Sequence, residues 1–192
     1  MPSPTQLRDQ AARLAPENVS EAVKIAETIE DPWFRTQALG WAVRYALDDH
    51  DAERFARLAI ESAADADDAY RQVAPCAWPL RALIERGLRD FALELLEIVL
   101  TAVPRIQANA SRAEALSHLL HAMFDTSEEI RRSLAFALRE LADEDEHWRV
   151  QRAIRDALRI LYPVDPDFAV KLGIQSEPDG SYVTETPRPF FW

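Results

Sequence analysis

Glycine is scarce in this chain, and alternating runs of β-branched residues are absent from it. Only four of the 192 residues are glycine. Alanine, leucine, glutamate and arginine dominate, so helix propensity is high almost throughout. A chain of this length can bury roughly 70% of the surface that it exposes when unfolded, so its core needs neither a metal ion nor a disulfide. The composition therefore predicts an all-α fold.

Cysteine is limited to one residue, Cys76, which excludes an internal disulfide framework and fits a reducing cytosol. It lies in the apolar stretch VAPCAW, where we expect a buried, inert thiol rather than a nucleophile. No apolar run approaches membrane-spanning length, and the first ten residues lack the basic and apolar regions of a signal peptide. We therefore expect a soluble, cytoplasmic protein without a membrane partner.

Basic residues are also few, because the sequence has 22 Lys and Arg residues but 33 Asp and Glu residues. The resulting net charge of −11 at pH 7 repels a phosphate backbone, and no lysine-rich or arginine-rich stripe offsets it. We therefore expect no nucleic-acid partner. A basic protein surface is compatible with this charge.

What the chain does contain is helical periodicity, most clearly in LRDFALELLEIVLTAVP. Its apolar residues fall at i, i+3, i+4, i+7, i+8, i+11 and i+15, which predicts one broad apolar helix face. Gly87 before this stretch can end a helix in a left-handed cap, and Pro104 after it cannot continue one. In EDPWFRTQAL, Asp31 is expected to cap a helix that begins at Pro32, where the missing N–H has no cost.

The same signals divide the whole chain into short helices. We expect them near residues 5–14, 17–30, 32–47, 51–64, 67–86, 88–103, 106–124, 127–142, 146–162 and 165–174. Pro75 and Pro79 predict a kink or an interruption within 67–86. Residues 1–16 then form an N-terminal capping segment, 17–174 a helical repeat domain, and 175–192 an extended, non-helical tail.

Two sets of residues recur at a period near 38. One set lies early in successive first helices, at separations of 36, 41 and 37 residues: Arg35, Arg71, Arg112 and Arg149. Three of these arginines follow an acid four residues earlier: Asp31, Asp67 and Asp145. The other set lies early in the second helices: Ala52, Ala92, Ile130 and Ala169.

Two helices repeated at this period predict a right-handed αα-superhelix, an α-solenoid of about four helix pairs. We expect the repeated arginines to have a structural role. Each pairs either with the acid that precedes it or with a carboxylate of the adjacent unit.

Two segments, ALGWAVRYALDDHDAERFARLAIESA and LIERGLRDFALELLEIVLTAVP, resemble tetratricopeptide repeats. Leu39 and Gly40 match the small-residue pair of the family's first helix. Gly87, Ala92 and Pro104 match its turn glycine, second-helix alanine and closing proline. The period here is longer than the family's usual one and the last two units match poorly, so the resemblance is to an irregular array, and a HEAT-like array also fits.

In tetratricopeptide repeats, the first helix of each pair lines a concave groove that holds a peptide or a segment of another protein. The resemblance therefore implies a non-enzymatic protein-binding module that needs no cofactor. Carried over to this sequence, the groove positions are Phe34, Gln37, Trp41, Arg44 and Tyr45 in the first unit, and Ala74, Ala77, Arg81, Ile84 and Glu85 in the second.

A metal-binding or metal-dependent protein is the alternative interpretation. EALSHLLHAMF places Glu114, His118 and His121 at i, i+4 and i+7 on one helix face, and this ligand set suits Zn²⁺ or Fe²⁺. The helix offers only three ligands, so a half-buried histidine pair at a helix interface is the favoured interpretation.

A second acidic cluster lies in LDDHDAER, where we expect a solvated turn that caps the next helix rather than a cation site. A Gly-rich phosphate loop, a nucleophile elbow and Cys/His zinc spacing are all missing from the sequence, so it does not indicate an enzyme.

The end of the sequence carries four aromatic side chains on an acidic segment: Tyr182, Phe190, Phe191 and Trp192. Leaving such side chains in water is costly, so we expect them to dock on the last helix pair, in the protein's own groove or on a second copy. Docking on a second copy would make the protein a structural subunit that oligomerises through its tail, which is the third hypothesis.

Overall fold

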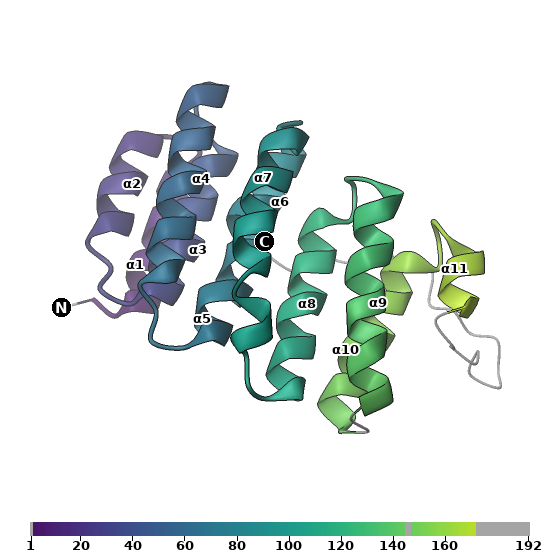
Figure 1. Cartoon of the computed structure of the whole chain (residues 1–192). Helices are drawn as coiled ribbons and strands as arrows, with labels where there is room; N and C mark the ends of the chain where they lie inside the picture. The colour runs from purple at the N-terminus through teal and green to yellow at the C-terminus, as the bar shows by residue number, and fades with distance from the viewer. Residues whose placement is uncertain (1, 145–146, 172–192) are drawn as a thin grey trace. The chain divides into compact units, whose positions relative to one another are not determined.

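The computed structural model describes residues 2–144 and 147–171, and these residues form helices joined by turns, with no strand among them (Figure 1). This confirms the predicted all-α class. The contacts divide the chain into two compact units, residues 1–106 and residues 107–192, of which the second is described as far as Lys171. No helix in the described ranges is long and apolar enough to cross a membrane.

Unit 1 is a succession of helix pairs. Its α-helices are α1 (Pro4–Leu14), α2 (Val19–Glu27), α3 (Pro32–Arg44), α4 (Asp49–Ala64), α5 (Ala69–Val73), α6 (Ala77–Glu85) and α7 (Arg89–Leu100), with 3₁₀ turns η1 (Ala74–Cys76) and η2 (Val103–Arg105). Within this unit α1 packs on α2, α3 on α4, and α6 on α7. The first helices also contact one another, because α3 packs against both α1 and α6.

The described part of unit 2 contains three long helices and one short one. They are α8 (Asn109–Met123), α9 (Glu128–Glu144), α10 (Trp148–Leu161) and α11 (Pro166–Lys171). Helix α8 packs against α9 and α10, α9 packs against α10, and α10 contacts the short α11. The predicted helices agree with the observed ones within a few residues at most ends, except where prolines interrupt them.

The predicted helix boundaries at Asp31 and Gly87 are confirmed. An Asp31 carboxylate oxygen accepts a hydrogen bond from the Trp33 backbone N–H at 2.9 Å, and Pro32 is the first residue of α3. Gly87 has a φ of +83°, and the N–H of Leu88 reaches back to the carbonyl of Leu83 at 3.0 Å. This left-handed glycine closes α6 and turns the chain into α7.

The predicted interruption of segment 67–86 is also confirmed. Pro75 lies in the 3₁₀ turn η1, which separates α5 from α6. Pro79 is the third residue of α6, a position whose N–H has no partner within the helix. Cys76 is buried in η1, its thiol donates to the Gln72 carbonyl at 3.1 Å, and burial raises the pKa of the thiol. The expectation of a buried cysteine is confirmed.

The positions of the repeated arginines relative to the starts of their helices vary more than the spacing in the sequence indicated. The residues at the N-cap positions of the four first helices are Asp31, Asp68, Ala108 and His147. The arginines stand four, three, four and two residues after them, so they are not structurally equivalent. Asp67 is not the cap of its helix, because Asp68 takes that place, and Asp145 lies outside the described residues.

The register of the second helices is better preserved. Ala52, Ala92 and Ala169 each stand four residues after the residue that immediately precedes the helix, namely Asp48, Leu88 and Asp165. All three alanines are buried. Ile130 is half-buried and stands three residues after Ser127, so the third member of this set deviates.

Candidate functional site

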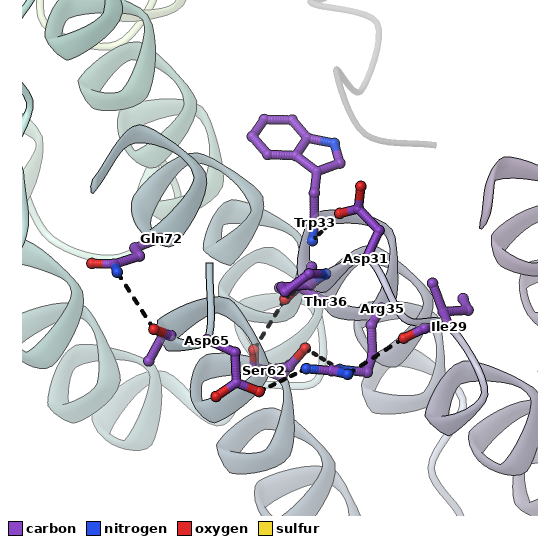
Figure 2. Close-up of polar contacts among 11 residues, drawn as sticks. Ile29, Asp31, Trp33, Arg35, Thr36, Ser62, Asp65 and Gln72 are labelled. Carbon is purple, nitrogen blue, oxygen red and sulfur yellow. Dashed lines mark hydrogen bonds and ion pairs between the residues drawn. The ribbon is translucent and has the colours of Figure 1, made fainter. Parts of the chain in front are cut away.

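Arg35 joins the two helices of the α3–α4 pair, as Figure 2 shows. Its guanidinium donates to the Ser62 hydroxyl at 2.6 Å and to the Asp65 carboxylate at 2.7 Å, both at the end of α4. The hydroxyl of the neighbouring Thr36 is fully buried and lies 2.8 Å from the Pro32 carbonyl of α3 and 3.2 Å from the Ala59 carbonyl of α4. These bonds fix the two helices against each other, so Arg35 has a structural role.

Two of the other repeated arginines bind a carboxylate of the preceding helix pair. Arg71 at α5 donates to Asp31 at 2.5 Å, and the Tyr70 ring stacks on Trp33 with centroids 5.7 Å apart. The hydrogen bond from Arg71 to Asp31 raises the pKa of the guanidinium. In unit 2, Arg149 of α10 donates to Glu114 of α8 at 2.9 Å. The expected pairing with an adjacent unit is confirmed for these two arginines.

The Glu114, His118 and His121 face is therefore engaged in packing within unit 2. Glu114 binds Arg149, and His118 is buried with 8% of its surface exposed. Burial lowers the pKa of both histidines to about 4; at His121 the charge of His118 contributes to this lowering and the charge of Asp156 opposes it. The ligand atoms of these three residues do not gather at one point.

Among the residues that the structure describes, Asp48, His50 and Asp51 are the three whose ligand atoms lie within 4.8 Å of one another. Asp48 accepts the Asp51 backbone N–H at 2.8 Å and so caps α4, while the Asp51 carboxylate pairs with Arg54 at 2.8 Å. Asp49 pairs with Arg86 at 3.4 Å. The prediction that this turn caps the next helix is confirmed.

Five of the predicted groove residues come together on α3 and α6, and we call them the α3–α6 face: Trp41, Arg44, Tyr45, Arg81 and Glu85. The carboxylate of Glu85 accepts from Arg81 Nε at 3.0 Å and lies 3.4 Å from Arg44 Nη2. The Arg44 guanidinium lies 5.8 Å from the centroid of the Trp41 ring. Trp41 and Tyr45 stack almost in parallel, with centroids 6.2 Å apart and 3° between the ring planes.

These side chains are part of the unit's surface. Tyr45 is 37% exposed, and the side chains of Arg44, Arg81 and Glu85 are 22–30% exposed. Trp41 is half-buried. The face therefore combines aromatic surface, two guanidinium groups and one carboxylate that a ligand can reach.

Gly40 allows α3 and α6 to approach closely enough to form this face. A Cβ atom at residue 40 would lie 2.9 Å from the Trp78 Cβ and 3.2 Å from the Pro79 nitrogen. Real Cβ contacts essentially never fall below 3.0 Å. The glycine of the predicted Leu39–Gly40 pair therefore has a specific packing function in this structure.

The remaining predicted groove residues contribute to packing. Gln37 is buried and accepts a hydrogen bond from Arg8 of α1 at 3.1 Å, and the Arg8 guanidinium lies 5.6 Å from the centroid of the Phe34 ring. In the second unit Ala74, Ala77 and Ile84 are core residues. Helix α1 thus covers the N-terminal part of the predicted groove positions on α3.

Sequence reasoning missed the roles of Arg8 and Arg86. Arg86 donates to the carbonyls of Arg44 and Ala46 at 3.3 and 2.9 Å, so it binds backbone oxygens at the end of α3. Its place in the last turn before Gly87 is typical of a basic residue that stabilises carbonyls at helix ends. Nothing in the sequence indicated that Arg8 would reach α3.

A small crevice lies between α9 and α10 of unit 2, lined by Ala135, Leu138, Arg139, Ile154, Ala157 and Leu158. Its volume is about 10 Å³, which is at the limit for one water molecule and far too small for a substrate. The predicted tail residues Tyr182, Phe190, Phe191 and Trp192 lie outside the described residues.

Comparison with protein families, with curated proteins and with solved structures finds no match to this chain.

Proposed function

We propose that unit 1 is a non-enzymatic binding module and that its α3–α6 face holds a segment of another protein. The observation that carries this proposal is the convergence of Trp41, Arg44, Tyr45, Arg81 and Glu85 from two helices about forty residues apart in sequence. Tryptophan, tyrosine and arginine are the residue types that contribute most to binding energy at protein interfaces.

The contacts within the face hold these side chains in place before a ligand arrives. Glu85 orients both guanidinium groups, and the stacking of Trp41 on Tyr45 restricts both rings. Side chains that are already ordered lose less conformational entropy on binding, which favours affinity. Phe34 and Gln37 are not part of the proposed face because α1 packs on them.

We also propose that the helix pairs of unit 1 form a tetratricopeptide-like stack. The contacts of α3 with α1 and with α6 support this arrangement, because neighbouring first helices of such repeats pack in one layer. The close approach at Gly40 supports it as well. In such a stack the exposed side of the first helices is the binding surface.

The net charge of the chain indicates which kind of partner is favoured. A net charge of −11 attracts a protein with basic surface at long range. At the face itself, the guanidinium groups of Arg44 and Arg81 select for hydrogen-bond acceptors, and the Trp41 and Tyr45 rings select for apolar or aromatic side chains. We therefore propose a partner with an overall basic surface whose docking segment offers acceptors and an apolar side chain.

The proposal is tested by affinity capture with the full chain and with the double variant Trp41→Ala/Arg81→Ala. We expect the variant to lose the partner that the parent retains, since truncating a hot-spot residue costs about 2 kcal/mol or more, roughly thirtyfold in affinity. The matched control is Trp148→Ala/Arg152→Ala, which removes a comparable tryptophan and arginine pair from unit 2. Equal recovery by parent and Trp41→Ala/Arg81→Ala would contradict the proposal.

A further inference from the structure

The last helices of unit 2 expose more apolar surface than the rest of the described chain. Seven large apolar side chains are exposed in the part of the chain that the structure describes, and four of them lie on α9–α11 or the turn before α11. They are Phe136, Trp148, Val164 and Val170, at 54%, 61%, 49% and 61% exposure. Single exposed apolar residues are ordinary on a protein surface, whereas a contiguous aromatic cluster marks a surface that another segment can cover, and Phe136 belongs to such a cluster.

Phe136 is the outer residue of an ordered aromatic cluster. Its ring meets Phe168 edge to face, with centroids 5.1 Å apart and 76° between the ring planes. Phe168 lies beneath it with 4% exposure, and the Arg132 guanidinium lies 4.9 Å from the Phe168 centroid and 2.7 Å from Asp165. The cluster is held in place by these contacts, yet half of the Phe136 ring remains open to water.

The chain itself supplies a segment of matching chemistry directly after this surface. Residues 172–192 follow α11 without a break, and they carry Tyr182, Phe190, Phe191 and Trp192. At up to about 3.3 Å per residue, the segment is long enough to reach back over α9 and α11. No second molecule is needed to bring the aromatic side chains to Phe136.

The charges are complementary as well. Helix α10 carries four arginines and one aspartate, a net charge of +3, although the chain as a whole is acidic. Residues 172–192 carry Glu177, Asp179 and Glu185 against Arg188, a net charge of −2. An acidic segment is therefore favoured beside α10, whereas α9, with five acidic residues and three arginines, has a net charge of −2.

We propose that the C-terminal segment, residues 172–192, docks on unit 2 and covers the aromatic cluster of α9 and α11. Its aromatic side chains pack against Phe136 and Val170, and its carboxylates lie toward the arginines of α10. This contact completes the apolar end of unit 2 and is independent of the function proposed for unit 1.

Photo-crosslinking of the full chain tests the proposal. Phe191 is replaced by p-benzoylphenylalanine, which keeps an aromatic ring and forms adducts with neighbouring C–H groups on irradiation, and the adducts are located by mass spectrometry. We expect adducts within the same molecule at residues 132–171. Adducts at residues 4–106, adducts that join two copies, or a yield no higher than that in urea would each overturn the proposal.

Matched substitutions sharpen this test. Phe136→Asp removes the exposed ring and places a charge on the docking surface, so the adduct yield is expected to fall at least about tenfold. Ile98→Asp alters a residue of similar exposure on α7 of unit 1 and is expected to leave the yield unchanged. Val170→Asp serves as a second variant if circular dichroism shows that Phe136→Asp is unfolded. A yield that none of these folded variants alters would also overturn the proposal.

Discussion

Glu85 is the residue on which the α3–α6 face depends. Its two carboxylate oxygens face one guanidinium from α6 and one from α3, so a single side chain positions both arginines. Arg81 stands four residues before Glu85, which a helical sequence pattern can indicate. Arg44 lies on another helix, and its contact with Glu85 depends on the packing of α3 against α6, which no local pattern specifies.

At the same scale, the buried histidines of α8 make unit 2 sensitive to acid. Burial lowers the pKa of His118 and His121 to about 4, whereas an unfolded chain has the ordinary value near 6.5. The unfolded state therefore binds more protons between pH 6.5 and 4, and the free energy of unfolding falls as the pH drops through this range. Asp156 opposes this effect at His121, because its charge favours the protonated imidazole.

We expect acidification from pH 7 to pH 5 to cost about 1–2 kcal/mol per histidine. Urea unfolding of the full chain measures this loss. The variant His118→Gln/His121→Gln is expected to lose less stability over the same interval, because it lacks the two buried imidazoles that bind protons on unfolding. An equal loss in parent and variant would show that the buried histidines do not govern acid sensitivity.

At the scale of the elements, Gly40 decides how closely α3 and α6 approach. An added methyl group would meet the Trp78 Cβ and the backbone of Pro79, which cannot move without shifting α6. Helix propensity alone predicts the opposite effect, since alanine in a helix interior is about 1 kcal/mol more favourable than glycine. For Gly40→Ala, helix propensity therefore predicts a gain in stability, whereas the steric contacts predict a loss.

We expect Gly40→Ala to destabilise the protein by about 1–3 kcal/mol, because overpacking between these helices outweighs the gain in helix propensity. Thermal unfolding measures the change. Glu61→Ala, on an exposed position of α4, is the control and should alter stability by less than about 0.5 kcal/mol. A Gly40→Ala variant as stable as the parent would show that α6 can retreat without cost.

The helices themselves were largely predictable, because their limits are local. Asp31 with Pro32, Gly87, and Pro75 each stop or start a helix through their own backbone chemistry, and each does so in the structure. The positions of the repeated arginines relative to the caps of their helices could not be predicted in the same way. Asp67 and Asp68 are equally suited to cap α5, and the sequence does not show which of them does so.

The surroundings of Gln37 and Phe34 depend on how the helices pack, and the sequence did not indicate them. Gln37 and Phe34 match the groove pattern, yet α1 lies across them through Arg8. Such contacts join helices that are not related by the repeat period, so no periodic pattern in the sequence predicts them. The five residues of the α3–α6 face were predicted from the resemblance to tetratricopeptide repeats, whereas the contacts among them come from the structure.

At the scale of the whole molecule, the two compact units have different surfaces. Unit 1 offers the α3–α6 face, with aromatic and basic side chains held by Glu85. Unit 2 has buried histidines and an exposed aromatic cluster at its end. We therefore propose that unit 1 binds another protein and that residues 172–192 complete unit 2.

Hydrogen–deuterium exchange of the full chain, with and without its captured partner, tests the central claim most directly. We predict that the partner slows exchange in the C-terminal turns of α3 and α6, around Trp41–Tyr45 and Arg81–Glu85, and that this protection is lost in Trp41→Ala/Arg81→Ala. Protection confined to α4, α7 or the helices of unit 2, with α3 and α6 unaffected, would contradict the account.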